Sequence, residues 1–442
     1  MNGKHLGVLA FVLVTAVFAA GGRSTARAPW APMAQAMIPA PPAAEQVPDQ
    51  VVVQFAAWVD LAAQQLVAEA VGGQLEDSVG PGLALLRVDA GRVPWIAALV
   101  GTLPGVEFAE PNALVHALGT PNDPYFAPFQ WNLYDDGVAS NGVPSHFGIR
   151  AESAWDQSSG AKVVVAVVDT GVAYENYQKF KKAPDLAAAR FVAPRNVLAG
   201  TSHANDDHGH GTSVAEVIAA GTSNGYGIAG VATACKIMPV KVLDEHGTGT
   251  AANSAKGIRW AADHGAQVIN LSLGGKTPSR AVKRAVKYAW DKGCVVVAAS
   301  GNDGVDGVSY PARYPQCIAV GATRFDGRRA PYSNFGADLD LVAPGGDMEV
   351  DQNDDGYPDG ILVETFSGAP SSFGYFLVAG TSVACPQVAA VAALIKAAHP
   401  RFGNAQIRAA LESTAIDLGA SGADAQFGKG LVNAAAAVSY HP

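Results

Sequence analysis

Three short motifs contain the residue types of a nucleophilic catalytic unit. Asp169 ends an apolar run and precedes Thr-Gly, His210 lies in Gly-His-Gly-Thr, and Ser382 lies in Gly-Thr-Ser. A serine hydroxyl becomes an effective nucleophile when a histidine takes its proton, and a carboxylate fixes the tautomer of that histidine and stabilises its charged form. Each motif alone is a weak signal, because Asp and Ser also cap helices. Together they predict an Asp-His-Ser triad for acyl transfer.

The order of the motifs narrows the class of enzyme. Asp comes first, His second and Ser third, which differs from the order in chymotrypsin and in α/β-hydrolases. The serine is not in Gly-x-Ser-x-Gly, which argues against a lipase-like turn. His208 competes for the role of base, but residues two apart do not share a helix face. We assign the base to His210, which directly precedes Gly-Thr, and expect His208 to be a neighbour at the substrate cleft.

Strands and helices alternate through the part of the chain that holds the three motifs. Apolar runs without polar alternation predict parallel strands buried on both faces, at Val163–Val168, Cys235–Val242, Val268–Leu273, Val295–Ser300 and Ile318–Val320. Helical stretches are expected at Thr212–Ala220, Ala251–His264, Ser279–Lys292 and Thr381–Ala398. The alternation predicts an α/β fold with a three-layer, doubly wound, mostly parallel sheet, and an active site beyond the carboxyl ends of its strands.

Three shorter segments precede this domain. Lys4 and His5 lead into an apolar run over 6–20 and an Ala-Arg-Ala site that ends at Ala28, which predicts a cleaved signal peptide over 1–28. A Pro- and Ala-rich linker follows over 29–46. Segment 47–118 is close to a β-α-β-β-α-β order, which predicts a small ferredoxin-like α+β domain. Its elements are expected at Gln50–Phe55, Asp60–Ala70, Leu83–Val88, Val93–Leu99, Val106–Ala109 and Ala113–Val115.

From about Asn122 to the end, the chain resembles the subtilisin-like serine proteases, the subtilase family. Besides the triad motifs, the resemblance rests on Asn122–Phe126, Gln130-Trp131, Pro239–Leu243, Asn270–Gly275 and Ala299–Asn302. It implies that residues 119–442 form a serine endopeptidase domain. It also implies that Asn302 and the backbone N–H of Ser382 stabilise the oxyanion of the tetrahedral intermediate. Ser213, Glu216 and Gln387 stand where the family usually has His, Gly and His, and we expect these departures to bear on local packing and subfamily and not on the catalytic chemistry.

The resemblance also outlines a substrate pocket. Its walls are implied for Ser272, Leu273 and Gly274 on one side and for Ala299, Ser300 and Gly301 on the other. The backbone of 272–274 would pair with the substrate as an added strand. Asp303 would lie at the pocket rim, where its charge either favours a basic substrate side chain or is simply that of a solvated loop residue.

Two segments predict structural calcium sites. Segment 351–359 has oxygen ligands at its first, third and fifth positions, Gly at the sixth and Asp at the ninth, as in the first part of an EF-hand loop, although the closing Glu is absent. Its candidate ligands are Asp351, Asn353, Asp355, Tyr357 and Asp359. The alternative is an acidic turn. The resemblance implies a second site at Asp123, Asp185 and Asn224, with backbone carbonyls from 223–228.

The resemblance further implies that segment 47–118 is a propeptide. Such a domain assists folding and inhibits the enzyme, and the stretch 114–121 would lie in the active site and be cut by Ser382. The expected partners are protein or peptide substrates and the protein's own propeptide. The net charge is −9 over 442 residues and no basic run stands out, so nucleic acid is not an expected partner. After signal cleavage we expect a soluble, secreted, extracellular monomer without a membrane partner.

Three questions stay open at the level of sequence. Cys294 and Cys317 each begin an apolar run and could form a disulfide if those strands were parallel neighbours, whereas Cys385 could be a small buried thiol; Cys235 is the fourth cysteine. A second functional class is a catalytically silent subtilisin-like binding module, against which the intact triad and oxyanion residues argue. Labelling of Ser382 by an organophosphonate probe separates the two. A narrow maturation role and a broad digestive role also stay open.

Overall fold

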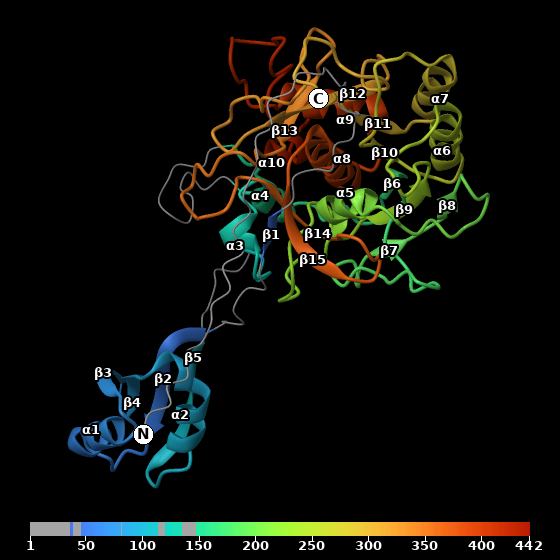
Figure 1. Cartoon of the computed structure of the whole chain (residues 1–442). Helices are drawn as coiled ribbons and strands as arrows, with labels where there is room; N and C mark the ends of the chain where they lie inside the picture. Colours follow the sequence, from blue (N-terminus) through green and yellow to red (C-terminus); the bar gives the residue numbers. More distant parts are fainter. Residues whose placement is uncertain (1–35, 39–45, 81, 114–119, 135–146) are drawn as a thin grey trace, which may run out of the picture.

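The computed structural model describes residues 36–38, 46–80, 82–113, 120–134 and 147–442. The predicted signal peptide over 1–28 and most of the linking stretch 114–121 lie outside these residues. The described chain forms a large domain, a small domain that precedes it, and a short strand at 36–38 (Figure 1).

A parallel sheet runs through the large domain in the order β7-β9-β6-β10-β11-β12-β13, and β8 also pairs with β9. Its strands are β6 (Val164–Asp169), β7 (Arg190–Phe191), β8 (Arg195–Asn196), β9 (Lys236–Lys241), β10 (Val268–Leu271), β11 (Val295–Ala299), β12 (Cys317–Thr323) and β13 (Leu341–Pro344). The strand order reverses at β6, which carries Asp169 at its carboxyl end. In open α/β sheets such a switch point leaves a crevice where ligands bind.

Helices cover both faces of this sheet, which gives the predicted three layers. One face packs against α4 (Ala151–Trp155), α5 (His210–Ala219), α8 (Thr381–Ala398), α9 (Asn404–Ser413) and α10 (Ala434–Val438), and the other against α6 (Ala251–Asp263) and α7 (Arg280–Asp291). The short helix α3 spans Phe126–Phe129. In β6, Val165 and Val167 join the core on the α8 side, whereas Ala166 and Val168 join the core beneath α6 and α7. Burial on both faces explains why these strands are continuously apolar.

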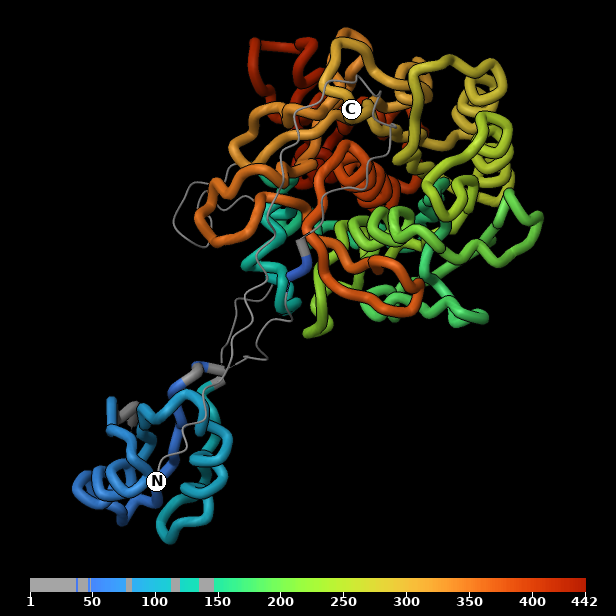
Figure 2. Tube along the Cα trace, in the orientation of Figure 1, coloured from blue at the N-terminus to red at the C-terminus, as the bar shows by residue number. Residues whose placement is uncertain are grey.

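The small domain is an antiparallel sheet in the order β3-β4-β2-β5, as predicted for a ferredoxin-like plan. It consists of β2 (Gln46–Phe55), α1 (Leu61–Ala70), β3 (Gln74–Gly80), β4 (Leu83–Arg87), the 3₁₀ turn η1 (Ala90–Arg92), α2 (Val93–Val100) and β5 (Val106–Ala113). Strand β3 has no counterpart among the predicted elements because its sequence is mostly polar. Figure 2 shows this domain in blue as a unit of its own.

A second, three-stranded sheet in the large domain has the order β1-β15-β14. The hairpin partners β14 (Ile361–Phe366) and β15 (Phe373–Val378) are antiparallel, and β1 (Ala36–Ile38) pairs antiparallel with the free side of β15. The hairpin leads directly into α8. Within the described residues α8 is the one helix long and apolar enough to cross a membrane, and 83% of its apolar window is buried inside the domain.

All four cysteines are buried free thiols. The suggested Cys294–Cys317 disulfide is therefore wrong, although β11 and β12 are indeed parallel neighbours. The register explains why: Cys317 pairs with Val296, two residues beyond Cys294, and each residue advances a strand by about 3.3 Å. The Cys294 thiol instead donates to the carbonyl of Ala266 at 3.0 Å.

Candidate active site

The imidazole of His210 is bonded to the carboxylate of Asp169. Nδ1 of His210 lies 2.7 Å from Oδ1 of Asp169, and the two side chains are 8% and 0% exposed. Burial lowers the pKa of His210, but the charge of Asp169 and the hydrogen bond to it outweigh burial, so the net pKa lies above the ordinary value. A carboxylate on Nδ1 holds the tautomer in which Nδ1 carries the proton, so Nε2 is the nitrogen that can accept one.

The buried carboxylate of Asp206 shapes the loop that presents His210. Its oxygens accept from the backbone N–H groups of His208 and Gly209 at 3.0 Å and of Thr212 at 2.9 Å. They satisfy N–H groups at the start of α5, whose N-cap residue, Gly209, has no side chain to do so. A Cβ on Gly209 would lie 2.9 Å from the carbonyl oxygen of Phe366, and its φ is +100°, so only glycine fits there.

Lys241 holds the turn that follows Asp169. Its Nζ donates to the carbonyl oxygens of Thr170 at 2.6 Å and Leu243 at 2.7 Å, and it pairs with Asp207 at 2.6 Å. The Lys241 side chain is 5% exposed, so these three acceptors compensate a buried charge. The sequence motifs gave no reason to single out Asp206 or Lys241, because their partners become neighbours only in the fold.

Ser382 is the second residue of α8 and is held from the sheet side. Its carbonyl oxygen accepts from Oγ of Ser272 at 2.8 Å, and that hydroxyl accepts from Asn270 Nδ2 at 2.9 Å. Asn270 in turn accepts from the thiol of Cys385 at 3.2 Å. Burial raises the pKa of this thiol, and the charge of Asp169 adds to the rise. Helix α8 packs beside α5, so the helix starts that carry Ser382 and His210 belong to adjacent elements.

The amide of Asn302 has a defined orientation. Its Oδ1 accepts from both the backbone N–H of Thr381 at 2.9 Å and the Thr381 hydroxyl at 2.8 Å. Because the oxygen is engaged, Nδ2 is the edge left to donate elsewhere. Gly301, just before it, has a φ of +109°, and a Cβ there would lie 2.4 Å from Asn334 Nδ2. Thr381 is thus an orienting residue that the sequence motifs did not identify.

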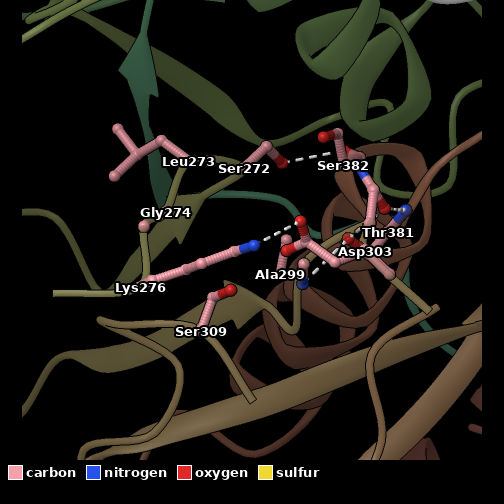
Figure 3. Close-up of a pocket in the computed structure, with 12 residues that line it drawn as sticks. Ser272, Leu273, Gly274, Lys276, Ala299, Asp303, Ser309, Thr381 and Ser382 are labelled. Atoms are coloured by element: carbon pink, nitrogen blue, oxygen red, sulfur yellow. Dashed lines mark hydrogen bonds and ion pairs between the residues drawn. The ribbon is translucent and has the colours of Figure 1, made fainter. Parts of the chain in front are cut away.

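A cavity of about 330 Å³ opens beside Ser382 (Figure 3). It is lined by the loop after β10, by the end of β11 with the loop that follows, and by the start of α8. Of the predicted pocket residues Ser272, Leu273, Gly274, Ala299, Ser300, Gly301 and Asp303, all but Ser300 line it, together with Asn302 and Ser382. Ser300 is wholly buried, and its hydroxyl donates to the carbonyl of Asn334 at 3.0 Å.

One charged pair lies on the wall of this cavity. Lys276 extends toward Asp303 in Figure 3, and its Nζ lies 2.9 Å from the carboxylate. The side chains are 73% and 32% exposed. His208, the predicted cleft neighbour, lies beside His210 with ring centroids 6.3 Å apart, but it is not among the residues that line the cavity.

The structure brings together the three residues of the calcium site implied by resemblance. Asp123 accepts from the backbone N–H groups of Ser223 at 2.7 Å and Asn224 at 3.3 Å, and Asp185 accepts from that of Ile228 at 2.7 Å. Oδ1 of Asp185 is buried and has no hydrogen-bond partner in the described chain. Burial raises the pKa of Asp185 to about 8. A buried carboxylate with one oxygen lacking a hydrogen-bond partner, close to other carboxylates, is suited to binding a cation.

The loop over 351–359 binds backbone N–H groups of its own residues with its carboxylates. Asp351 accepts from the N–H of Gly356 at 3.0 Å, and Asp359 accepts from that of Gln352 at 2.8 Å. Oδ1 of Asp359 is buried without a partner in the described chain, and burial followed by the charges of Asp351 and Asp355 raises the pKa of Asp359 to about 7. The described residues contain no group of three His, Cys, Asp or Glu side chains set to hold a metal by themselves. Amide and carbonyl oxygens would have to complete either site.

Two buried glutamates near Asp185 were not predicted. Glu216 is 0% exposed and Glu364 is 1% exposed, and Oε2 of Glu364 accepts from the N–H of Asp185 at 2.8 Å. Burial raises the pKa of Glu216 well above its ordinary value, and the charge of Glu364 adds to the rise. Glu216 occupies a position where the family usually has glycine, so this departure changes the electrostatics beneath α5 as well as the packing.

Comparisons with known proteins agree with this fold. Residues 160–430 match the family model of the subtilase family, and residues 32–112 match that of the fervidolysin N-terminal prodomain. The chain is 36% identical to the thermophilic serine proteinase of Bacillus sp. (strain AK1), over 89% of this chain and 88% of that protein. It is 39% identical to thermitase of Thermoactinomyces vulgaris, over 73% of this chain and all of that protein. A solved protease from Pseudoalteromonas arctica PAMC 21717 superposes with a TM-score of 0.63 at 35% identity, covering 72% of this chain and 99% of that one.

The fold and these matches define a serine protease with a doubly wound α/β catalytic domain and an N-terminal prodomain. The chain belongs to the subtilase family.

Proposed function

We propose that this chain is a secreted, self-processing serine endopeptidase in which Asp169, His210 and Ser382 form the catalytic triad. The observation that carries the proposal is the buried 2.7 Å hydrogen bond between His210 Nδ1 and Asp169 Oδ1, at the edge of the sheet where α8 presents Ser382 beside a cavity. An imidazole held in this way is ready to act as a general base.

The proposed reaction follows from these positions. His210 Nε2 takes the proton of the Ser382 hydroxyl as its oxygen attacks the carbonyl carbon of the scissile peptide. The oxyanion accepts hydrogen bonds from Asn302 Nδ2 and from the backbone N–H of Ser382. His210 then gives its proton to the departing amine, and an acyl-enzyme remains. In the second half, His210 takes a proton from a water molecule that attacks the acyl-enzyme, and the acid is released as Ser382 regains its proton. Asp169 stabilises the imidazolium in both halves.

The proposal also covers the rest of the chain. The pattern over 1–28 supports export, and the match of 32–112 to a prodomain supports a zymogen whose linking stretch 114–121 is cut by Ser382. The peptidase domain would then comprise residues 119–442, and the boundaries of the linker and propeptide would be 29–46 and 47–118. The expected partners are protein or peptide substrates and the propeptide as inhibitor, with the mature enzyme a monomer.

We further propose structural calcium at two places. Asp123, Asp185 and Asn224 would hold one ion with carbonyls of 223–228, and the loop over 351–359 would hold another through Asp351, Asn353, Asp355, Tyr357 and Asp359. The unpartnered buried oxygens of Asp185 and Asp359 support both assignments. Bound calcium would relieve the repulsion between these carboxylates and so stabilise the fold.

The test compares the exported chain with Ser382→Ala. Each protein is purified with calcium, and its size and its hydrolysis of casein are followed over time. The wild type should shorten to a fragment that begins near residue 119 and digest casein, whereas Ser382→Ala should stay full length and inactive. Ser372→Ala, at an exposed serine before α8, is the matched control and should behave as the wild type.

An organophosphonate probe gives a second readout that does not depend on the choice of substrate. It should label the wild type at Ser382 and leave Ser382→Ala unlabelled. If the wild type stays full length, leaves casein intact and takes up no label, the triad does not work and the silent binding module becomes the correct assignment.

A further inference from the structure

Strand β1 belongs to the front of the chain but binds the large domain. Residues 36–38 precede the small domain, whose sheet begins with β2 at Gln46. They pair antiparallel with β15, with Ala36 opposite Leu377, Met37 opposite Phe376 and Ile38 opposite Tyr375. Figure 1 shows β1 beside β14 and β15 and away from the sheet of β2 to β5. Among the described strands, this is the only pairing that joins the front of the chain to the large domain.

Side-chain burial adds to the backbone pairing. Ile38 is 3% exposed and packs in a cluster with Tyr125, Ile228 and Leu377. Met37, its neighbour on the opposite face of the strand, is 69% exposed. This alternation is that of a strand with one face on a core. Ile38 thus acts as an apolar anchor, and Met37 faces away from the contact.

Without β1, β15 would be an edge strand. Its pairing with β14 uses one side, and β1 uses the other over 375–377. An open edge presents unpaired N–H and C=O groups and binds extended segments readily. The pairing is therefore the addition of a peptide strand to an existing sheet.

We propose that residues 36–38 are a docking strand: by pairing with the edge of β15, they attach the propeptide to the peptidase domain at a second place, which persists after the linking stretch has been cut and slows release of the propeptide. This inference rests on the proposed self-processing. The docking strand and the linking stretch lie at opposite ends of the small domain, at 36–38 and 114–121, so cleavage of the second leaves the first in place. A tethered domain stays at high effective concentration and is recaptured more often than a free one.

The experiment follows two events separately in the full-length chain with calcium. Denaturing gels report when the linking stretch is cut, and size-exclusion chromatography with a casein assay reports when the propeptide leaves. Ile38→Asp places a charge in the buried site, and Met37→Asp is the matched control at the exposed neighbour. Ile38→Ala removes the apolar contact without adding a charge.

The docking strand predicts that all variants are cut at the wild-type rate. In Ile38→Asp the lag between cutting and activity should shorten about tenfold or more, in Ile38→Ala it should shorten by less, and in Met37→Asp it should equal that of the wild type. Equal lags in Ile38→Asp and the wild type would overturn the proposal. A wild type that is never cut would overturn the proposed function and the proposed role of the docking strand together.

A second measurement tests the docking independently of catalysis. Successive N–H groups of a strand point to opposite sides, so only some of those at 375–377 face β1. In the full-length Ser382→Ala protein, these β1-facing amide hydrogens should exchange slowly. In the double variant with Ile38→Asp they should exchange about tenfold or more faster, while amides of the sheet core such as Val167 and Val297 stay protected. Unchanged protection at 375–377 would show that β1 does not hold this edge, and loss of protection throughout the chain would show that the substitution unfolds the domain instead.

Discussion

Lys276 and Asp303 form an ion pair on the wall of the cavity beside Ser382, with Nζ of the lysine 2.9 Å from the carboxylate. The sequence alone leaves open whether the charge of Asp303 selects basic substrate side chains. In the structure that charge already has a partner. The pair is largely exposed, so its own contribution to stability is about 0–1 kcal/mol, but it removes most of the net charge from the pocket.

Lys276→Ala should therefore change selectivity more than activity. With Asp303 unpaired, kcat/KM for peptides with Arg or Lys at the residue before the cut should rise about fivefold relative to those with Phe, since ~1 kcal/mol of attraction becomes available. Asp303→Asn should shift selectivity the opposite way, toward acidic side chains. A selectivity ratio that is the same in all three proteins would show that the pocket does not sense this pair.

The raised pKa of His210 predicts the acid limb of activity. The base works only when it is neutral, and Asp169 holds its pKa above the ordinary value of about 6.5. Activity should thus fall as the pH drops through a midpoint above 6.5. Asp169→Asn should move the midpoint of kcat/KM to lower pH and reduce the rate by about 10⁴. Asp207→Asn, whose partner is Lys241, should leave the midpoint in place; an equal shift in both variants would contradict the assignment.

Thr381 should matter for rate through Asn302. Thr381→Val removes the hydroxyl that donates to Asn302 Oδ1 at 2.8 Å and keeps the backbone donor. A lost hydrogen bond of about 1 kcal/mol predicts a fall in kcat of about fivefold with little change in KM, and Thr381→Ser should restore it. Removing the amide itself with Asn302→Leu should cost about 10²–10³, a magnitude measured on subtilisin and carried over here. Equal kcat in Thr381→Val and the wild type would show that the hydroxyl has no orienting role.

Calcium removal should lower thermal stability. At a thousandfold excess of calcium over Kd, a site that exists only in the folded state contributes about 4 kcal/mol. A chelator should therefore lower the Tm of the wild type, and Asp185→Asn and Asp359→Asn should each reduce the size of that drop. Asp354→Asn changes an exposed carboxylate of the same loop that is not among the candidate ligands, and should respond as the wild type. A Tm of the wild type that does not change when the chelator is added would rule out both calcium sites.

The free cysteines give a direct chemical check of the fold. A thiol reagent should react with all four thiols when the protein is unfolded without reductant. In the folded protein it should react with none of them within minutes. Burial suppresses the reaction, and it also raises the pKa of Cys294 to about 11 and of Cys235 to about 12. Two reactive thiols after unfolding would instead indicate one disulfide.

The sequence alone determined the local features of this protein. The alternation of apolar strands and helices predicted the α/β class, and α8 was predicted at the bounds it has, Thr381–Ala398, because a long apolar run after Gly-Thr-Ser allows few other structures. The same local patterns located Asp169, His210, Ser382 and Asn302 at element ends. Six of seven predicted pocket residues line the cavity, since neighbouring parallel strands deliver their loops to one edge.

The tertiary structure decided everything that depends on which distant residues meet. Helix α5 begins at His210 because Asp206 and Gly209 shape its start. The register of β11 against β12 keeps Cys294 from lying opposite Cys317. Packing buries Ser300, and it brings Lys276 into contact with Asp303. Strand β1 pairs with β15 across more than three hundred residues of chain. Contacts of this kind produce no periodic pattern in the sequence, because the charged groups and strand edges that form them become neighbours only after the chain has folded.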